Sequence, residues 1–415
     1  MHNLKVGFAK QDITPPVGTE LCGYGYYLER RNTGVADPVY ARSIAFLEGS
    51  RRYLIVNCDL TGVDGNHNNL IKAEISKRLN LSEDDMLLAC IHTHTAPALA
   101  NLVGCGELDP TYAAWAVQKI VNCACEAFDA LQPVAEAKVS SCDNIEFGID
   151  RRGSGARICR TMYALTFTFE NRRPLVLLNY GCHPVAFDLQ DKVSADYPGA
   201  AVAAMDELGC DAVFLNAFCG DVNPAEKRDY ESVLKGRQFA TYYEASMANA
   251  EVLEDLTLQS ASFDEYLDLQ FLPQETIDKE VAYMLRVSNN SKAFQKVTGI
   301  WEKVNVARRN GMLPAQDLLH VRFFAIGKVL FAGFSAEMAS ELRYIISEDH
   351  FSDYIVFPIG NLFDTRRYLA TIPLFDRNTY ETINSTFAYG TSPIVKGEAE
   401  RAVTSACKRA KRELH

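Results

Sequence analysis

The stretch that decides the fold is MLLACIHTHTAP, Met86 to Pro97, in which an unbroken apolar run ends in two histidines at alternate positions. The apolar run is typical of a buried strand, and the Thr-Ala-Pro after the histidines indicates a turn. Two imidazoles at the end of one buried strand indicate a functional site rather than core packing. On a continuing strand, His92 and His94 would share one face but be spaced along it, so a single ion need not reach both.

Three other apolar strands also end in polar residues, and this repetition predicts the fold class. VLLNYGCHP leads to His183, AVFLNAFCGD leads to Asp221, and KVLFAGF leads towards Glu337. In open α/β sheets, sites form where the carboxyl ends of strands converge. Strands and helices alternate through much of the chain, which predicts an α/β layered fold with a mixed β-sheet core flanked by helices.

Hydrophobic periodicity and turn residues place the individual elements. We expect strands at 162–169, 175–180 and 212–216, and a strand pair over 320–334 that turns at Gly327. We expect helices at 69–79, 109–131, 197–208, 230–255, 274–307 and from about 336 to 348.

Bulk properties narrow the functional classes. A chain of 415 residues without repeats or obvious linkers is expected to form one domain, 1–415. Its net charge of −11 argues against a nucleic-acid partner. No window holds ~18 consecutive apolar residues and the N-terminus lacks a signal-like core, so we expect no membrane span and a cytoplasmic location. The twelve cysteines mostly stand in apolar contexts, where cysteine acts as a small buried hydrophobe.

The residue types at the strand ends are those of a metallohydrolase. Two histidines, a carboxylate and an open position describe a catalytic zinc site, which activates water and polarises a carbonyl. The loop CGDVNP contributes Asn223, which is able to hold a carbonyl or an oxyanion; the alternative is a plain turn capped by Asp221. Glu337 has an alternative too, as a helix-start carboxylate that only favours the helix dipole.

Several motifs together resemble the neutral/alkaline non-lysosomal ceramidase family. In chain order they are QDITPPVGTELCGYG, GVADPVYARSIAFLEG, CDLTG, HTHTAP, NYGCHP, SADYPG and CGDVNP. The resemblance runs from about Gly7 to Gly390 and is weakest over about 230–315. It implies a ceramidase-like catalytic domain, here in a short cytoplasmic form without the C-terminal immunoglobulin-like domain of larger members.

The resemblance also implies a site. The family it resembles is a zinc amidase, and its ligand positions fall on His92, His183, Glu337 and Tyr368. The Glu337 assignment is made without the Pro-Gly that precedes the family's glutamate.

Further positions follow from the same resemblance. His94 is expected to assist catalysis, Tyr380 to contact the substrate at the reaction centre, and Arg151 (or Arg152) to anchor the substrate. Asn223 stands where the family has a serine, so a metal-activated water becomes the attacking group. Asp221, in the same loop, is assigned to substrate binding.

These expectations predict a zinc-dependent hydrolase that cleaves a linear N-acyl amide, ceramidase-like but with a small amide or lipid-like substrate other than ceramide. One alternative is a binding protein that keeps the metal scaffold without catalysis. Another is an amidohydrolase-type barrel, which would need further metal-binding histidines, and the remaining histidines stand in poor contexts for that role.

Overall fold

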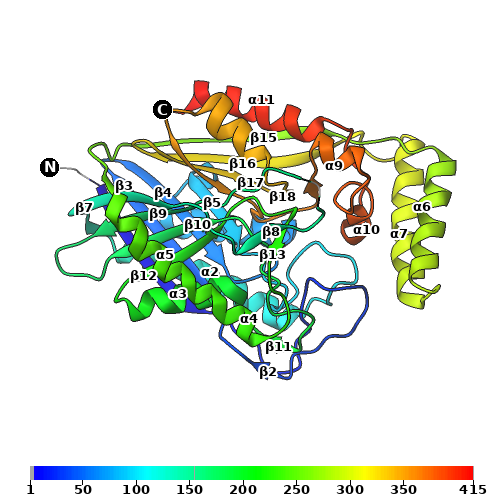
Figure 1. The fold of residues 1–415 in the computed structure, drawn as a ribbon, viewed down its shortest axis with the longest axis horizontal. Helices are drawn as coiled ribbons and strands as arrows, with labels where there is room; N and C mark the ends of the chain where they lie inside the picture. The colour runs from blue at the N-terminus through cyan, green and yellow to red at the C-terminus, as the bar shows by residue number, and fades with distance from the viewer. Residues whose placement is uncertain (1–3, 154, 415) are drawn as a thin grey trace.

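The computed structural model describes residues 4–153 and 155–414, and its centre is formed by three β-sheets (Figure 1). The strands of the first sheet are β1 (Leu4–Asp12), β3 (Tyr40–Glu48), β4 (Arg51–Cys58), β5 (Met86–Cys90) and β6 (Gln132–Pro133). Their order is β5-β4-β3-β1-β6. β4 and β5 run parallel, whereas β3 pairs with β4 and β1 in the antiparallel sense, so this sheet is mixed.

The other two large sheets are mixed as well. The second is built from β7 (Glu136–Cys142), β9 (Met162–Thr168), β10 (Leu175–Tyr180), β12 (Asp211–Asn216) and β14 (Glu251–Val252), in the order β12-β10-β9-β7-β14. The third is built from β15 (Leu258–Asp268), β16 (Gln316–Ile326), β17 (Val329–Phe334) and β19 (Ile355–Ile359), in that order. β10 with β12 and β17 with β19 are the parallel pairs.

Three short strand pairs lie outside these sheets. They are β2 (Gly34–Val35) with β11 (Lys192–Val193), β8 (Gly148–Asp150) with β13 (Val222–Pro224), and β18 (Glu337–Met338) with β20 (Tyr368–Leu369). The last two pairs carry residues of the candidate site.

Helices cover the outer faces of the sheets (Figure 1). α2 packs on β1 and β3, α3 on β12, and α11 on β15. The helices are α1 (Gly65–Leu79), α2 (Pro110–Asp129), α3 (Asp196–Glu207), α4 (Tyr230–Leu234), α5 (Gln238–Ser246), α6 (Gln274–Val287), α7 (Lys292–Arg309), α8 (Leu342–Tyr344), α9 (Ile372–Asp376), α10 (Ser385–Tyr389) and α11 (Glu398–Glu413). α6 and α7 form a hairpin that stands out from the body at the right of Figure 1.

One apolar core joins the three sheets. Leu87 of the first sheet, Leu177 of the second and Phe331 of the third belong to a single cluster of buried side chains. The carboxyl ends of the strands are also tied together, because the side-chain amide of Asn216 donates to the Ile91 carbonyl oxygen at 2.8 Å. The predicted α/β layered fold with a mixed sheet core is confirmed.

Three predicted helices were wrong in detail. The 230–255 segment is α4 and α5 followed by β14, and 274–307 is broken into α6 and α7. The 336–348 segment begins with β18 and continues through α8 into a π-helical turn, Ile345–His350. Glu337 therefore lies on a short strand and not at a helix start, which removes the helix-dipole interpretation of this carboxylate.

The structure also bears on the expectations about membrane-spanning helices and about the cysteines. None of the described helices combines the length and apolarity needed to cross a bilayer. All twelve cysteines are free, and Cys182 next to His183 is fully buried, where burial raises the pKa of its thiol well above the ordinary value.

Candidate metal centre

His92 is held at the end of β5 by an unusual backbone conformation. Its φ of 73° lies in the left-handed region, so the chain leaves the strand direction at this residue and does not continue extended. Its backbone N–H donates to Leu60 O at 2.9 Å and its ring Nδ1 lies 2.7 Å from Thr61 O. The turn brings the ring centroids of His92 and His94 to 4.9 Å, closer than an extended strand would suggest.

His183 occupies the equivalent place after β10. Its backbone N–H donates to Val222 O at 3.0 Å, and its ring Nδ1 lies 2.7 Å from Cys219 O. Burial, reinforced by the positive charge of Arg151, lowers the pKa of His183 to about 4, so the imidazole is neutral at pH 7.

Glu337 completes the group from β18. Its N–H donates to Arg367 O at 2.9 Å, and β18 is fixed by parallel pairing of Glu337 with Tyr368. Its Oε2 lies 3.0 Å from His183 Nε2 and 3.2 Å from His92 Nε2. Burial acts to raise the pKa of Glu337, but His92 and His183 outweigh it and lower the pKa well below its usual value.

These atoms fit a bound cation. Because Thr61 O and Cys219 O only accept hydrogen bonds, the Nδ1 of His92 and of His183 each carry the proton and donate it. The Nε2 atoms of the two rings then face Oε2 of the Glu337 carboxylate. Three lone pairs that converge in a buried place need a positive charge between them, and two imidazoles with a carboxylate are a donor set that zinc prefers.

His94 joins the same cluster. Ligand atoms of His92, His94 and His183 all lie within 4.8 Å of one another. Both ring nitrogens of His94 are buried without a hydrogen-bond partner among the described residues, and burial lowers its pKa well below the usual value. The space for this ring depends on Gly23, since a Cβ there would lie 2.5 Å from His94 Cγ.

Tyr368 and Tyr380 lie beside the histidines. The Tyr368 hydroxyl is 3.4 Å from His183 Nε2, and its ring meets the Tyr380 ring edge-on at 5.9 Å. Burial, with the charge of Glu337, raises the pKa of both hydroxyls above the ordinary value.

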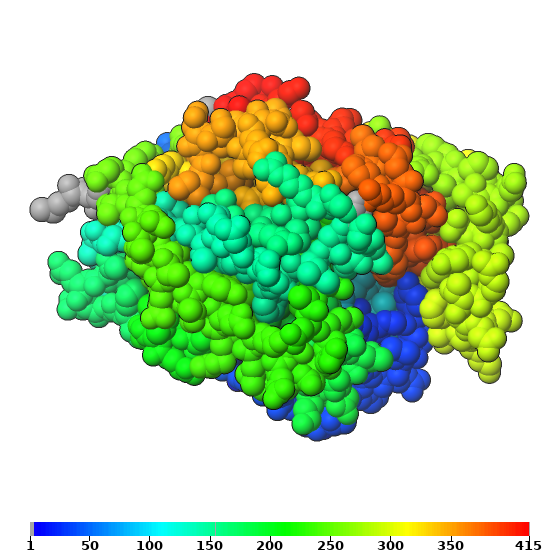
Figure 2. All heavy atoms as spheres, viewed as in Figure 1, coloured from blue at the N-terminus to red at the C-terminus, as the bar shows by residue number. Residues whose placement is uncertain are grey.

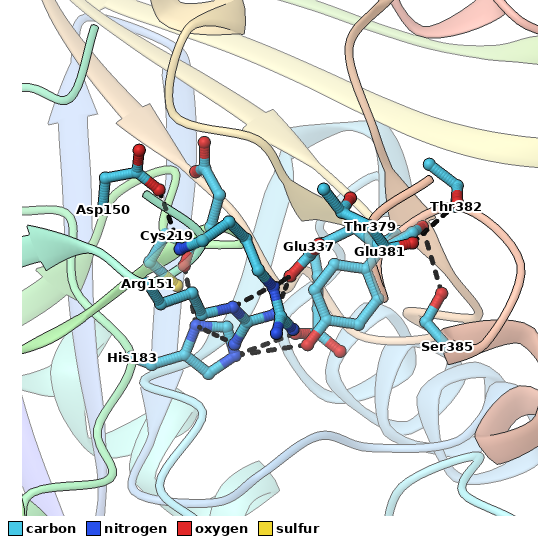
Figure 3. A network of polar contacts seen from close by, with 12 residues as sticks. Asp150, Arg151, His183, Cys219, Glu337, Thr379, Glu381, Thr382 and Ser385 are labelled. Atoms are coloured by element: carbon cyan, nitrogen blue, oxygen red, sulfur yellow. Dashed lines mark hydrogen bonds and ion pairs between the residues drawn. The ribbon is translucent and has the colours of Figure 1, made fainter. Parts of the chain in front are cut away.

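Arg151 lies between His183 and a second carboxylate, Glu381 (Figure 3). Its Nε and Nη2 donate to Glu381 Oε1 at 2.9 and 2.7 Å, and its Nη1 is 3.5 Å from His183 Nδ1. Arg152 Nε donates to the same Glu381 oxygen at 2.7 Å. The two sequence candidates for a substrate anchor are thus clamped by one buried carboxylate.

Asp221 directly precedes β13, and Asn223 lies on it. The Asp221 carboxylate accepts from the backbone N–H of Ser340 at 2.7 Å and from its hydroxyl at 3.1 Å, and burial raises its pKa to about 6. Asn223 pairs with Ile149 in the β8–β13 ladder. Among the described residues, neither one lines the cavity next to the histidines.

That cavity has a volume of about 340 Å³ and opens in a hollow of the surface (Figure 2). His92, His94, Glu337, Tyr368, Tyr380 and Tyr389 form its polar wall. The cavity is also lined by Tyr26 of the N-terminal loop and by Tyr283, Met284, Val287 and Phe294 of the α6–α7 hairpin. The volume is at the lower end of the ~300–1,000 Å³ typical of small-molecule sites.

Sequence reasoning missed two residues of this site. The Tyr389 hydroxyl donates to Glu337 Oε1, and Glu381 pairs with Arg151. Neither stands at the end of a long apolar strand, which was the signal used for the histidines. The only sequence feature that points to Glu381 is its position directly after Tyr380, which was itself predicted.

No protein-family model matches the chain, and no curated protein matches its sequence. Its structure, however, is similar to neutral ceramidase from Pseudomonas aeruginosa, with a TM-score of 0.74 and 17% identity over 100% of this chain and 75% of that one. A ceramidase complexed with C2 gives a TM-score of 0.73 and 16% identity, covering 100% of this chain and 76% of that one. The chain therefore has the fold of the neutral ceramidases.

Proposed function

We propose that the protein is a zinc-dependent hydrolase of linear N-acyl amides. The observation that carries this proposal is the convergence of His92 Nε2, His183 Nε2 and Glu337 Oε2 at the wall of a largely apolar cavity. The likeness of the fold to neutral ceramidases supports it.

In this proposal the metal is held by His92, His183, Glu337 and Tyr368. When bound, zinc supplies a Lewis acid that polarises a carbonyl and lowers the pKa of water to about 7. Tyr389 keeps the Glu337 carboxylate in place through its hydrogen bond to Oε1.

His94 is the proposed proton carrier. A neutral imidazole with both nitrogens unpartnered accepts a proton at one and donates from the other. Its place in the cavity wall beside His92 puts it within reach of a carbonyl bound there.

The remaining residues orient the substrate or its surroundings. Tyr380 lines the cavity. The guanidinium carbon of Arg151 lies 5.5 Å from the centroid of the Tyr368 ring, so a positive charge stands next to this cavity residue. Asp221 braces the residues after β18 by accepting hydrogen bonds from Ser340. Asn223, which we propose as a donor to the substrate carbonyl, lies in the adjoining β8–β13 ladder.

The test separates metal binding from turnover. Zinc content is measured by mass spectrometry and hydrolysis is followed with a panel of N-acyl amides. We expect His92→Ala and His183→Ala to lose both zinc and activity, and His94→Ala to keep zinc but lose at least about 100-fold in kcat, the usual contribution of a proton-transfer group.

His350→Ala is the matched control, since it removes a histidine on the π-helical turn away from the cavity. Stoichiometric zinc in His92→Ala would reject the ligand assignment. A zinc-loaded protein that binds N-acyl compounds tightly, yet cleaves none of them, would favour the binding-protein alternative.

A further inference from the structure

A second hollow adjoins the cavity next to the histidines. A space of about 520 Å³ is lined by Lys279, Glu280, Ala282, Tyr283 and Arg286 of α6 and by Asn378 and Asn384. Tyr283 and Asn384 also line the histidine-bearing cavity, so the two spaces adjoin across these residues. A molecule bound beside His92 that reached past Tyr283 and Asn384 would enter the outer hollow.

The two spaces differ in chemistry. In the inner one, the hairpin contributes Met284, Val287 and Phe294, and Glu337 is the one carboxylate among its described lining residues. The outer one has two cations, Lys279 and Arg286, against one carboxylate. A molecule that fills both needs an apolar segment near the scissile bond and a polar group beyond it.

The cations of the outer hollow are placed for a ligand. Lys279, Tyr283 and Arg286 are spaced i, i+4 and i+7, so they lie on one face of α6. Within the described chain no ion pair is formed by Lys279 or by Arg286, and the Arg286 guanidinium lies 5.7 Å from the centroid of the Tyr283 ring. On a protein with a net charge of −11, a locally positive hollow beside the site favours an anion there.

We propose that the substrate is an anionic N-acyl amide, with an apolar segment in the inner cavity and a carboxylate or similar anion held between Lys279 and Arg286. This inference rests on the proposed function and narrows its substrate class. The anion belongs to the substrate and takes no part in bond cleavage, so Lys279 and Arg286 determine specificity through KM.

The test uses matched pairs of substrates. N-acyl amides that carry a terminal carboxylate, on the amine part in one series and on the acyl part in the other, are compared with their uncharged methyl esters. We expect the carboxylates in one series to show roughly five- to tenfold higher kcat/KM at low salt, because two exposed ion pairs each add a modest attraction. The advantage declines as salt screens it.

Substitutions at Lys279 and Arg286 then test whether the outer hollow causes the preference for carboxylate substrates. Lys279→Gln with Arg286→Gln removes the preference, mainly through KM, and Glu280→Gln increases it. Lys292→Gln with Lys303→Gln is the control, since it makes the same charge change on α7 outside both spaces. Equal rates for the charged and uncharged partners in both series, or an equal loss in the control, would overturn the inference.

A binding measurement separates this inference from the reaction itself. Calorimetry of the same pairs on Glu337→Gln protein reports anion preference without turnover. If no amide is hydrolysed by the zinc-loaded enzyme, the proposed function fails, yet tighter binding of the carboxylates would still support the anion site. If hydrolysis occurs and binding shows no preference, only the anion site is rejected.

Discussion

Hydrogen-bond partners distinguish the residues of the site from one another. His92 and His183 each donate a hydrogen bond from Nδ1 to a backbone carbonyl oxygen. This bond fixes the tautomer and leaves Nε2 facing Glu337. His94 has no such partner, so its ring is free to change its hydrogen bonds during a reaction. Two of the three imidazoles in the cluster therefore have a fixed ring orientation suited to metal binding, and the third has a ring suited to proton transfer. The difference comes from the backbone carbonyl groups next to each ring.

Tyr389 gives a prediction at the level of one atom. Its hydroxyl donates to Glu337 Oε1, and removing such a partner of a ligating carboxylate typically weakens metal affinity ~10–100-fold. We expect Tyr389→Phe to show a loss of that size in zinc affinity, measured by competition with a chelator. Tyr266→Phe, an exposed tyrosine on β15, should leave the affinity unchanged, and an unchanged value in Tyr389→Phe would show that the hydrogen bond does not support the metal.

Single elements explain which sequence predictions succeeded. β5 and β10 are buried along their whole length, and buried strands that pair in parallel read as continuous apolar runs, so both were predictable. β18 was not, because its partner β20 lies about thirty residues further along the chain and two residues leave no periodic pattern. The site histidines were therefore found from the sequence itself. Glu337 was a strand-end candidate whose assignment as a ligand came from the family resemblance, and Tyr368 came only from that resemblance.

Turn chemistry and close packing explain the broken helices. Asn289 and Asn290 adopt positive φ, and Ser291 caps α7, so the local sequence Ser-Asn-Asn-Ser did contain a turn signal that the helical periodicity concealed. Between α4 and α5 the chain makes a 3-10 turn at Gly236, whose lack of a side chain lets it approach Tyr197 O, since a Cβ there would lie 2.1 Å from that atom. No local pattern reports that contact.

Trp301 is the largest buried side chain of the α6–α7 hairpin. Trp301 is fully buried, stacks on Phe387 at 4.2 Å and donates from Nε1 to Thr386 Oγ1 at 2.8 Å. Trp301→Ala should cost about 3–5 kcal/mol of unfolding free energy, measured by denaturant titration. Hydrogen exchange in 274–309 should increase more than in the sheets; Ile300→Ala, on the exposed face, should change little.

At the scale of the whole molecule, the geometry of the candidate site depends on the contacts between sheets as much as on the sheets themselves. The shared core of Leu87, Leu177 and Phe331 supports our proposal that the chain forms a single catalytic domain. The strand ends that carry the site come from different sheets, so the geometry of the metal centre depends on how firmly the sheets are joined. His320 on β16 is bonded to Asp364, whose backbone N–H in turn reaches the segment after β4 of the first sheet.

His320 predicts a pH dependence of stability. Its Nδ1 lies 2.7 Å from Asp264 Oδ1 on β15, and its Nε2 lies 3.5 Å from Asp364 Oδ2 in the loop after β19. The backbone N–H of Asp364 also donates to Val63 O, in the segment after β4. Hydrogen bonds to Asp264 and Asp364 raise the pKa of His320, against burial and the nearby Lys72. A group whose pKa is raised on folding stabilises the protein fully below its unfolded pKa, about 6.5. That stabilisation is lost as the pH rises through the folded pKa.

The contribution is isolated by comparing wild type with His320→Gln in denaturant titrations from pH 5.5 to 9. Because the ring is partly exposed, we expect a difference of up to about 1 kcal/mol below pH 6.5 that shrinks towards higher pH. Arg366, whose Nε is bonded to Asp364 Oδ1, keeps that carboxylate partly compensated when His320 is neutral, so the loss should be gradual and not a collapse of the contact with Asp364. A difference that is constant across this range, or that grows with pH, would mean that the charge on His320 does not stabilise its contacts with Asp264 and Asp364.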